Sequence, residues 1–258
     1  MIVDEVPKPV KDLVHEYLNL QINSCTVRAP YYRNVKRIRA ELRSLVGKGL
    51  PSEIVEETLI YSKLRGFILE GKSEEEIRDF MILQGIGVDC SGFAAHIYDK
   101  WLKSSDRGNL VNKLQFKETS FYRSIIRRIR PIENISANDL TNEKNSTPIK
   151  LNQISPGDLI RLKGVKRGDH LAIIYSTTRD ESNSLKQVTY VHSSPAYQKD
   201  NGVKFGEIVI TDPEKDLKDQ QWREVDKNGK CWTLECLLRD YQQNRNGLRR
   251  PNFLIKPE

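Results

Sequence analysis

A cysteine lies in a short stretch punctuated by glycines, Gly85-Ile86-Gly87-Val88-Asp89-Cys90-Ser91-Gly92-Phe93. Apolar residues recur at three- and four-residue spacing from Phe93 to Leu102, which predicts an amphipathic helix that begins at or beside the cysteine. The free N–H groups and the positive dipole end at a helix start favour a thiolate over a thiol. Cys90 is therefore a candidate nucleophile, although an arbitrary cysteine is more often buried and inert.

A nucleophilic cysteine needs a base, and the chain offers four histidines, at positions 15, 96, 170 and 192. His170 opens a continuous apolar run, and His192 lies in the next strand-like segment. Two consecutive strands predict a hairpin that sets one imidazole beside the thiol and the other behind it to fix its tautomer. His96, six positions after the cysteine on the expected helix, should point away as a packing or surface group. Cys90, His170 and His192 form a candidate catalytic triad.

Four blocks follow one another along residues 89–193: Asp89-Cys90-Ser91-Gly92-Phe93, Ser155-Pro156-Gly157-Asp158-Leu159-Ile160, His170-Leu171-Ala172-Ile173-Ile174-Tyr175 and Val191-His192-Ser193. Their order and identity resemble the signature of the NlpC-type cysteine peptidases, papain-like enzymes best known for cutting the peptide stems of bacterial cell walls. The resemblance implies Cys90 as nucleophile, His170 as base and His192 as the residue that orients it. It also implies that Asp89 and Ser91 line the substrate site.

The chain departs from this family at two places. Family members carry a tyrosine shortly before the cysteine, whereas the nearest tyrosine before Cys90 here is Tyr61. Tyr31, in Pro30-Tyr31-Tyr32, takes that place in the substrate site if a long insertion separates it from the cysteine. The interval between the two histidines is longer than in the family, and residues 176–184 are expected to form an extended hairpin loop. Both departures concern the choice of substrate more than the chemistry.

The composition is that of a folded, basic protein. With 258 residues, of which 38% are hydrophobic, the chain can bury a substantial core. Its net charge of +7 indicates anionic surroundings such as cell-wall polymer, nucleic acid or membrane headgroups, and does not choose among them. The arginine-rich segment 120–130 is expected to be a solvated helix, because its arginines are not interleaved with aromatic residues for base stacking. A nucleic-acid partner is therefore not expected.

The cysteines do not indicate a disulfide framework or a metal site. Those at positions 25, 90, 231 and 236 are too few and too irregular for the former. Cys231 and Cys236 lack both the two-residue spacing and the nearby histidine of a zinc site. The sequence also lacks a phosphate-binding glycine loop. We expect neither a metal nor a cofactor.

The N-terminal segment 1–10 has no cationic start followed by an apolar core, and the sequence has no run of about eighteen apolar residues. The sequence thus predicts neither a signal peptide nor a membrane span. The expected location is the cytoplasm, where a thiol stays reduced, or the exterior after export without a readable signal peptide. The oligomeric state is left open.

Residues 1–83 are expected to form a mostly helical region that packs against a catalytic domain at residues 84–258. Helices are predicted over 7–21 and 34–46, after Pro51, and from Ser73, where Ser73 and Glu76 form a capping-box pattern. Residues 136–147 are expected to be a loop. The segment 151–162 is predicted to turn through Pro156-Gly157 into a strand, and further strands are predicted at 171–176, 188–192, 203–210 and 252–255. Helices followed by antiparallel strands indicate an α+β fold, and the resemblance specifies the papain-like NlpC type with a helical extension.

The expected function is that of a cysteine hydrolase that cleaves an amide bond. The resemblance implies a γ-D-glutamyl peptide bond in a peptidoglycan stem, so the expected partner is a peptide or muropeptide substrate. The same Cys and His layout serves amidases and acyltransferases, and reaction on another substrate is an alternative. A non-catalytic binding module with the same fold is a second alternative, against which the three intact triad positions argue.

Overall fold

The computed structural model describes residues 1–34, 42–116, 125, 129–163, 169–239 and 246–255. Its elements, in chain order, are β1 (Ile2–Glu5), α1 (Lys8–Leu18), β2 (Leu20–Ile22), β3 (Cys25–Val27), η1 (Arg43–Val46), α2 (Pro51–Leu64), α3 (Glu74–Gln84), α4 (Cys90–Ser104), α5 (Leu110–Lys113), η2 (Ile132–Asn134), α7 (Ala137–Thr141), β4 (Ser146–Pro148), η3 (Leu151–Gln153), β5 (Leu159–Lys163), β6 (Asp169–Arg179), β7 (Leu185–Ser194), η4 (Gln198–Asp200), β8 (Gly202–Val209), η5 (Leu217–Asp219), β9 (Gln221–Trp222), α8 (Trp232–Leu238), β10 (Gly247–Pro251) and η7 (Asn252–Leu254), where η marks a 3₁₀ helix.

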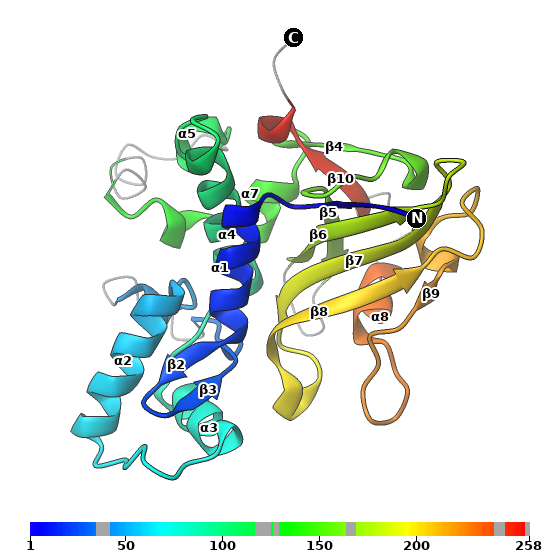
Figure 1. Cartoon of the computed structure of the whole chain (residues 1–258). Coiled ribbons are helices and arrows are strands. Elements are labelled where there is room, and N and C mark those ends of the chain that lie inside the picture. Colours follow the sequence, from blue (N-terminus) through cyan, green and yellow to red (C-terminus); the bar gives the residue numbers. More distant parts are fainter. Residues whose placement is uncertain (35–41, 117–124, 126–128, 164–168, 240–245, 256–258) are drawn as a thin grey trace.

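Within the described residues, eight strands form one antiparallel sheet (Figure 1). Seven of them run in the order β4-β10-β5-β6-β7-β8-β9, and β1 pairs with β6. The pairing of β5 with β6 ends at Ile173, and β1 pairs with β6 further along, from Ser176 to Arg179. The mixture of helices with an antiparallel sheet confirms the α+β class.

Both faces of this sheet are covered, which explains the continuous apolar run of β6. Alternate residues of a strand point to opposite faces. Leu171 and Ile173 join a core cluster with α1 and α4, whereas Ala172 and Ile174 join a second cluster with α8. Figure 1 shows α1 and α4 beside the sheet, with α8 behind strands β7 and β8. The cysteine helix is therefore packed directly against the strand that carries the predicted base, His170, as its second residue.

Several predicted elements are confirmed. Helices α1 and α2 lie where the apolar spacing places them, and β6 and β7 form the predicted hairpin. Ser73 caps α3 as predicted: its Oγ accepts the Glu76 N–H at 3.3 Å, and the Glu76 carboxylate accepts the Ser73 N–H at 2.9 Å. Of the helix expected over 34–46, residues 35–41 lie outside the described residues, and 43–46 form the 3₁₀ helix η1.

Other predictions are wrong. The expected loop at 136–147 contains α7 and β4, because Ser136 and Asp139 form a reciprocal capping box that supports a short helix. Four of the nine residues of the expected hairpin loop at 176–184 are strand, because β6 continues to Arg179 and pairs there with β1 and β7, and the loop is confined to 180–184. The strand expected at 252–255 is a 3₁₀ turn, since Asn252 turns toward Asn145 and Lys144 with hydrogen bonds of 2.9 and 3.1 Å. The helix expected over 120–130 lies mostly outside the described residues.

The N-terminal region and the cysteine helix share one hydrophobic core. Tyr17 of α1 packs edge-on against Phe93 of α4, with ring centroids 5.2 Å apart, and Val10 and Ile54 join the same cluster. The division into residues 1–83 and 84–258 stays a prediction. None of the described helices has the length and apolar character needed to cross a membrane.

Candidate active site

Cys90 is the first residue of α4, and the loop before it is tightly fixed. Asp89 is the N-cap, and its Oδ1 accepts the Gly92 N–H at 2.6 Å. The Asp89 N–H in turn donates to the Gly47 carbonyl at 2.8 Å. Gly92 is required by this approach, because a Cβ there would lie 2.6 Å from the Gly47 oxygen and 2.8 Å from the Lys48 side chain. The predicted helix start at the cysteine is therefore confirmed.

A buried lysine, which the sequence reasoning missed, holds both neighbours of Cys90. The Lys48 ammonium donates to Asp89 Oδ1 at 2.9 Å, to the Ser91 hydroxyl and to the Ile135 carbonyl at 3.1 Å. Ser91 also donates to Asp89 Oδ1 at 2.9 Å. The Lys48 carbonyl accepts a hydrogen bond of 2.8 Å from His96 Nε2. His96 is thus a buried packing residue that supports the lysine from α4.

The two predicted histidines lie together and continue into a buried carboxylate. His170 Nε2 lies 3.1 Å from His192 Nδ1, and His192 Nε2 lies 3.0 Å from Glu224 Oε1. Because an ionised carboxylate only accepts hydrogen bonds, His192 carries its hydrogen on Nε2. In the tautomer in which the His192 ring is neutral, its Nδ1 is the acceptor and His170 donates from Nε2. The Nδ1 of neutral His170 keeps its lone pair and is free to accept a proton.

Glu224 is the anchor of this chain. It is almost fully buried, and its Oε2 accepts hydrogen bonds from Tyr190 at 2.5 Å and Thr233 at 2.6 Å. Burial alone would raise the pKa of Glu224, but His192, Thr233 and Tyr190 together outweigh it and hold the pKa at about 2. The carboxylate is therefore ionised at neutral pH. Lys204 lies 3.6 Å from its Oε1.

The Cys90 sulfur lies at the peptide unit that follows His170. The backbone N–H of Leu171 is close enough to lower the pKa of the thiol. At Leu171, β6 pairs with β5 but not yet with β7, because the pairing of β6 with β7 begins at Ile173. The Cys90 thiol therefore approaches β6 on a stretch that β7 does not pair with. Among the described residues, no hydrogen bond links the Cys90 thiol directly to His170 or His192. Catalytic hydrogen bonds are often long before substrate binds and tighten only in the complex.

The thiol and the imidazole are both neutral in the free protein. Burial raises the pKa of Cys90 to about 12, and Asp89 adds to the rise, while Lys48 and the Leu171 and Ser91 N–H groups oppose it. Burial lowers the pKa of His170 to about 3, with a smaller contribution from His192. The expectation of a thiolate favoured by the helix start is therefore wrong for the free protein. Loss of water around the sulfur outweighs the local effect of the helix dipole.

The three predicted substrate-site residues lie around the cysteine. Tyr31 forms a parallel bridge with Val88, two residues before Cys90, and Lys48 pairs with the same residue on its other side. Burial raises the pKa of Tyr31, with smaller contributions from Cys90 and Asp89. The segment between Tyr31 and Cys90, which contains α2 and α3, thus brings the chain back beside Tyr31. The roles of Tyr31, Asp89 and Ser91 in binding stay predictions.

Other polar groups do not belong to this arrangement. Asp169, beside His170 in sequence, lies 3.8 Å from Arg161 and 3.9 Å from Lys163. Trp222 is buried in the second core and donates to the Leu217 carbonyl at 3.1 Å. In the part of the chain that the structure describes, no group of His, Cys, Asp and Glu could hold a metal ion. Cys25, Cys231 and Cys236 are free thiols.

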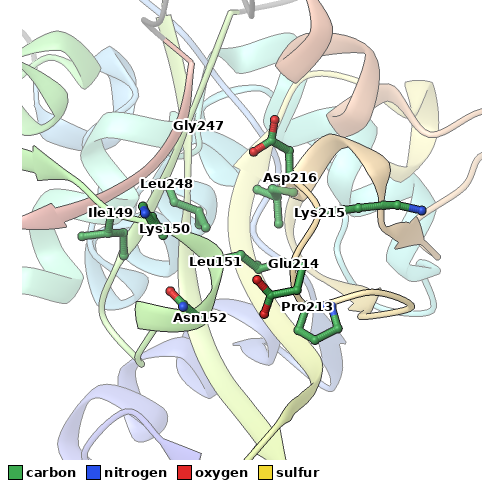
Figure 2. A pocket seen from close by; sticks show the side chains of 11 residues that line it. Ile149, Lys150, Leu151, Asn152, Pro213, Glu214, Lys215, Asp216, Gly247 and Leu248 are labelled. Carbon is green, nitrogen blue, oxygen red and sulfur yellow. The ribbon is translucent and has the colours of Figure 1, made fainter.

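A cavity of about 380 Å³ lies elsewhere, between η3, residues 213–217 and β10 (Figure 2). Its charged side chains have both signs, Lys150 and Lys215 with Glu214 and Asp216. None of the predicted site residues lines it. It belongs to the loop end of the second core and not to the cysteine site.

Two residues that complete the site, Glu224 and Lys48, carry weak sequence signals. Glu224 lies on an irregular segment after β9, two residues from the apolar Trp222 and far along the chain from either histidine. Lys48 lies between Gly47 and Gly49, a spacing typical of a close backbone approach. Neither position has a motif around it.

Comparison with known proteins assigns this chain to no family. The chain matches no family model, and no curated protein matches it.

Proposed function

We propose that this protein is a papain-like cysteine hydrolase of the NlpC type that cleaves an amide bond. The observation that carries the proposal is the hydrogen-bonded chain His170–His192–Glu224, together with a cysteine at a helix start that lies near the N–H of Leu171, the residue after His170. Such a chain fixes the tautomer of a base, which is the task of the third member of a catalytic triad. A purely structural pair of histidines would not need a buried carboxylate to set its protons.

In the proposed reaction, the Cys90 sulfur attacks the amide carbonyl carbon while its proton passes to His170 Nδ1. The carbonyl π electrons move to oxygen, and the Cys90 backbone N–H at the α4 start stabilises the resulting oxyanion. When the tetrahedral adduct collapses, the C–N bond breaks and protonated His170 donates its proton to the leaving amine. Water then attacks the thioester and gives a proton to His170, which returns it to the departing sulfur. His192 and Glu224 hold His170 in one tautomer throughout.

The proposed substrate is a γ-D-glutamyl peptide bond in a muropeptide. Three of the residues that the resemblance implies for binding, Asp89, Ser91 and Tyr31, surround Cys90. Asp89 Oδ1 is taken up by Lys48, Ser91 and Gly92, so its second carboxylate oxygen is the one that would face a polar group of the substrate.

The test is digestion of a muropeptide mixture, followed by mass spectrometry of the products. The wild-type protein should split the stem at the γ-D-glutamyl bond with addition of one water. Cys90→Ala should abolish cleavage while its thermal unfolding stays close to wild type, and Cys25→Ala, at another free thiol, should cleave normally. Appreciable cleavage by Cys90→Ala would refute the assignment.

A different product mass would separate the alternatives. Transfer of the acyl group to an added amine, or loss of ammonia from a side-chain amide, would replace hydrolysis with acyl transfer or deamidation at the same cysteine.

A further inference from the structure

A buried lysine, Lys48, contacts the residues on both sides of the proposed nucleophile at the start of α4, with an ion pair to Asp89 and a hydrogen bond to Ser91. Lys48 is 6% exposed, and its ammonium has three acceptors: Asp89 just before Cys90, Ser91 just after it, and the Ile135 carbonyl. A buried ammonium persists only when it is paired and hydrogen-bonded, and here all of its N–H bonds are used. The ammonium therefore has a fixed position relative to the sulfur.

Asp89 creates an electrostatic conflict that this ammonium offsets. The Asp89 carboxylate caps α4, but its charge opposes ionisation of the adjacent thiol. Lys48 acts in the opposite sense on the same sulfur. The other titratable groups that face Cys90 are His170, beside the Leu171 N–H on β6, and Tyr31, on the segment bridged to Val88. His170 is neutral in the free protein, so the balance between Lys48 and Asp89 sets the local field.

We propose that Lys48 is a positioning residue for Cys90: it fixes Asp89 and Ser91 around the cysteine, and its charge stabilises the sulfur anion that forms when His170 removes the thiol proton. The inference rests on the proposed function only in taking Cys90 as the nucleophile. It concerns an electrostatic role that the carboxylate cap makes necessary, and it does not depend on the substrate.

The experiment measures the rate at which iodoacetamide, a neutral reagent, labels Cys90 between pH 6 and 9, by mass spectrometry of the peptide that contains it. Lys48→Met should label about tenfold more slowly, because a nearby charge of opposite sign shifts a pKa by about one unit or more and the thiolate is the reactive form. Asp89→Asn, which keeps a good helix cap, should label about tenfold faster. The double variant Lys48→Met/Asp89→Asn should label at close to the wild-type rate.

Two further variants control for charge and shape. Lys103→Met removes the same charge from the far end of α4, about 20 Å along the helix, and should not change the rate. Lys48→Arg keeps the charge and should restore most of the rate lost in Lys48→Met.

A merely structural lysine would give a different pattern. Both single substitutions would then loosen the α4 start and expose the thiol, so both would accelerate labelling, and that result or an unchanged rate would overturn the inference. If Lys48→Met alone fails to fold, the double variant is compared with Asp89→Asn, and it must label more slowly. Because labelling needs no substrate, opposite shifts in a protein that leaves muropeptides intact would refute the proposed substrate and leave the role of Lys48 standing.

Discussion

Replacement of Glu224 by glutamine tests the buried chain His170–His192–Glu224 through its effect on stability. The partners of Glu224 hold its pKa at about 2, against an ordinary value of 4.5. A shift of this size corresponds to about 3 kcal/mol of stability at pH 7. Because the folded-state pKa is depressed, this contribution is present above pH 4.5 and is lost as the pH falls toward 2. Glutamine keeps the shape of the side chain and removes the charge, so Glu224→Gln should lose about 3 kcal/mol at pH 7.

The assay is urea denaturation at pH 7, 4.5 and 3, followed by circular dichroism. The difference between wild type and Glu224→Gln should be largest at pH 7 and should shrink at pH 3, where the carboxylate is protonated in the unfolded chain but still mostly ionised in the folded protein. Glu235→Gln is the matched control, because the Glu235 side chain is about half exposed (46%) and lies 3.6 Å from one lysine, Lys230; it should cost less than about 1 kcal/mol. A loss at Glu224 no larger than that at Glu235 would refute the reasoning, since the carboxylate would then not anchor the histidines.

Two other perturbations address the same region. Burial lowers the pKa of His170 to about 3 and that of His96 to about 4, from 6.5 in the unfolded chain, so the stability that each contributes above pH 6.5 declines as the pH falls toward these values. Urea denaturation should show that the free energy of unfolding falls by about 2 kcal/mol per histidine between pH 7 and pH 5. In His96→Gln this fall should be about half that of the wild-type protein. Equal falls in the two proteins would contradict the prediction. Gly206→Ala places a Cβ 2.2 Å from the Tyr190 ring and displaces its hydroxyl from Glu224, at a cost of about 1–3 kcal/mol. That cost should exceed the one for Tyr190→Phe, which removes the hydroxyl alone, and the opposite order would show that the ring moves freely.

The parts of the site that the sequence predicts are those with local signals. The apolar spacing after Cys90 places a helix, and the runs after His170 and before His192 place two strands, because each pattern reports which residues must be buried. The hairpin between the strands then brings the two imidazoles together, since residues of matching parity share one face. The order of the remaining strands has no such local signal. The position of the last strand has none either, and the prediction places it at 252–255 instead of 247–251.

The parts that sequence reasoning misses depend on contacts between distant segments. Glu224 reaches His192 only because β9 pairs with β8, and Lys48 reaches Asp89 only because the chain comes back, 41 residues later, to pair Val88 with Lys48 and Tyr31. The prediction of a thiolate at Cys90 is wrong for a related reason. The dipole at a helix start is a local property, whereas the burial that overrides it is produced by the packing of α4 against β6.

The positions of the two buried charged groups explain how a neutral thiol and a neutral imidazole could still react. Transfer of the proton from Cys90 to His170 creates a negative sulfur and a positive ring inside the protein, which is costly where water is absent. The sulfur anion would form beside the Lys48 ammonium, and the imidazolium would form at the head of a chain that ends at the Glu224 carboxylate. Each new charge thus meets a fixed charge of opposite sign that is already in place, so the protein need not reorganise when the proton moves. In this mechanism Lys48 and Glu224 both lower the energy of the same step, the proton transfer from Cys90 to His170. Because that step creates the sulfur anion and the imidazolium together, removal of either Lys48 or Glu224 raises its barrier.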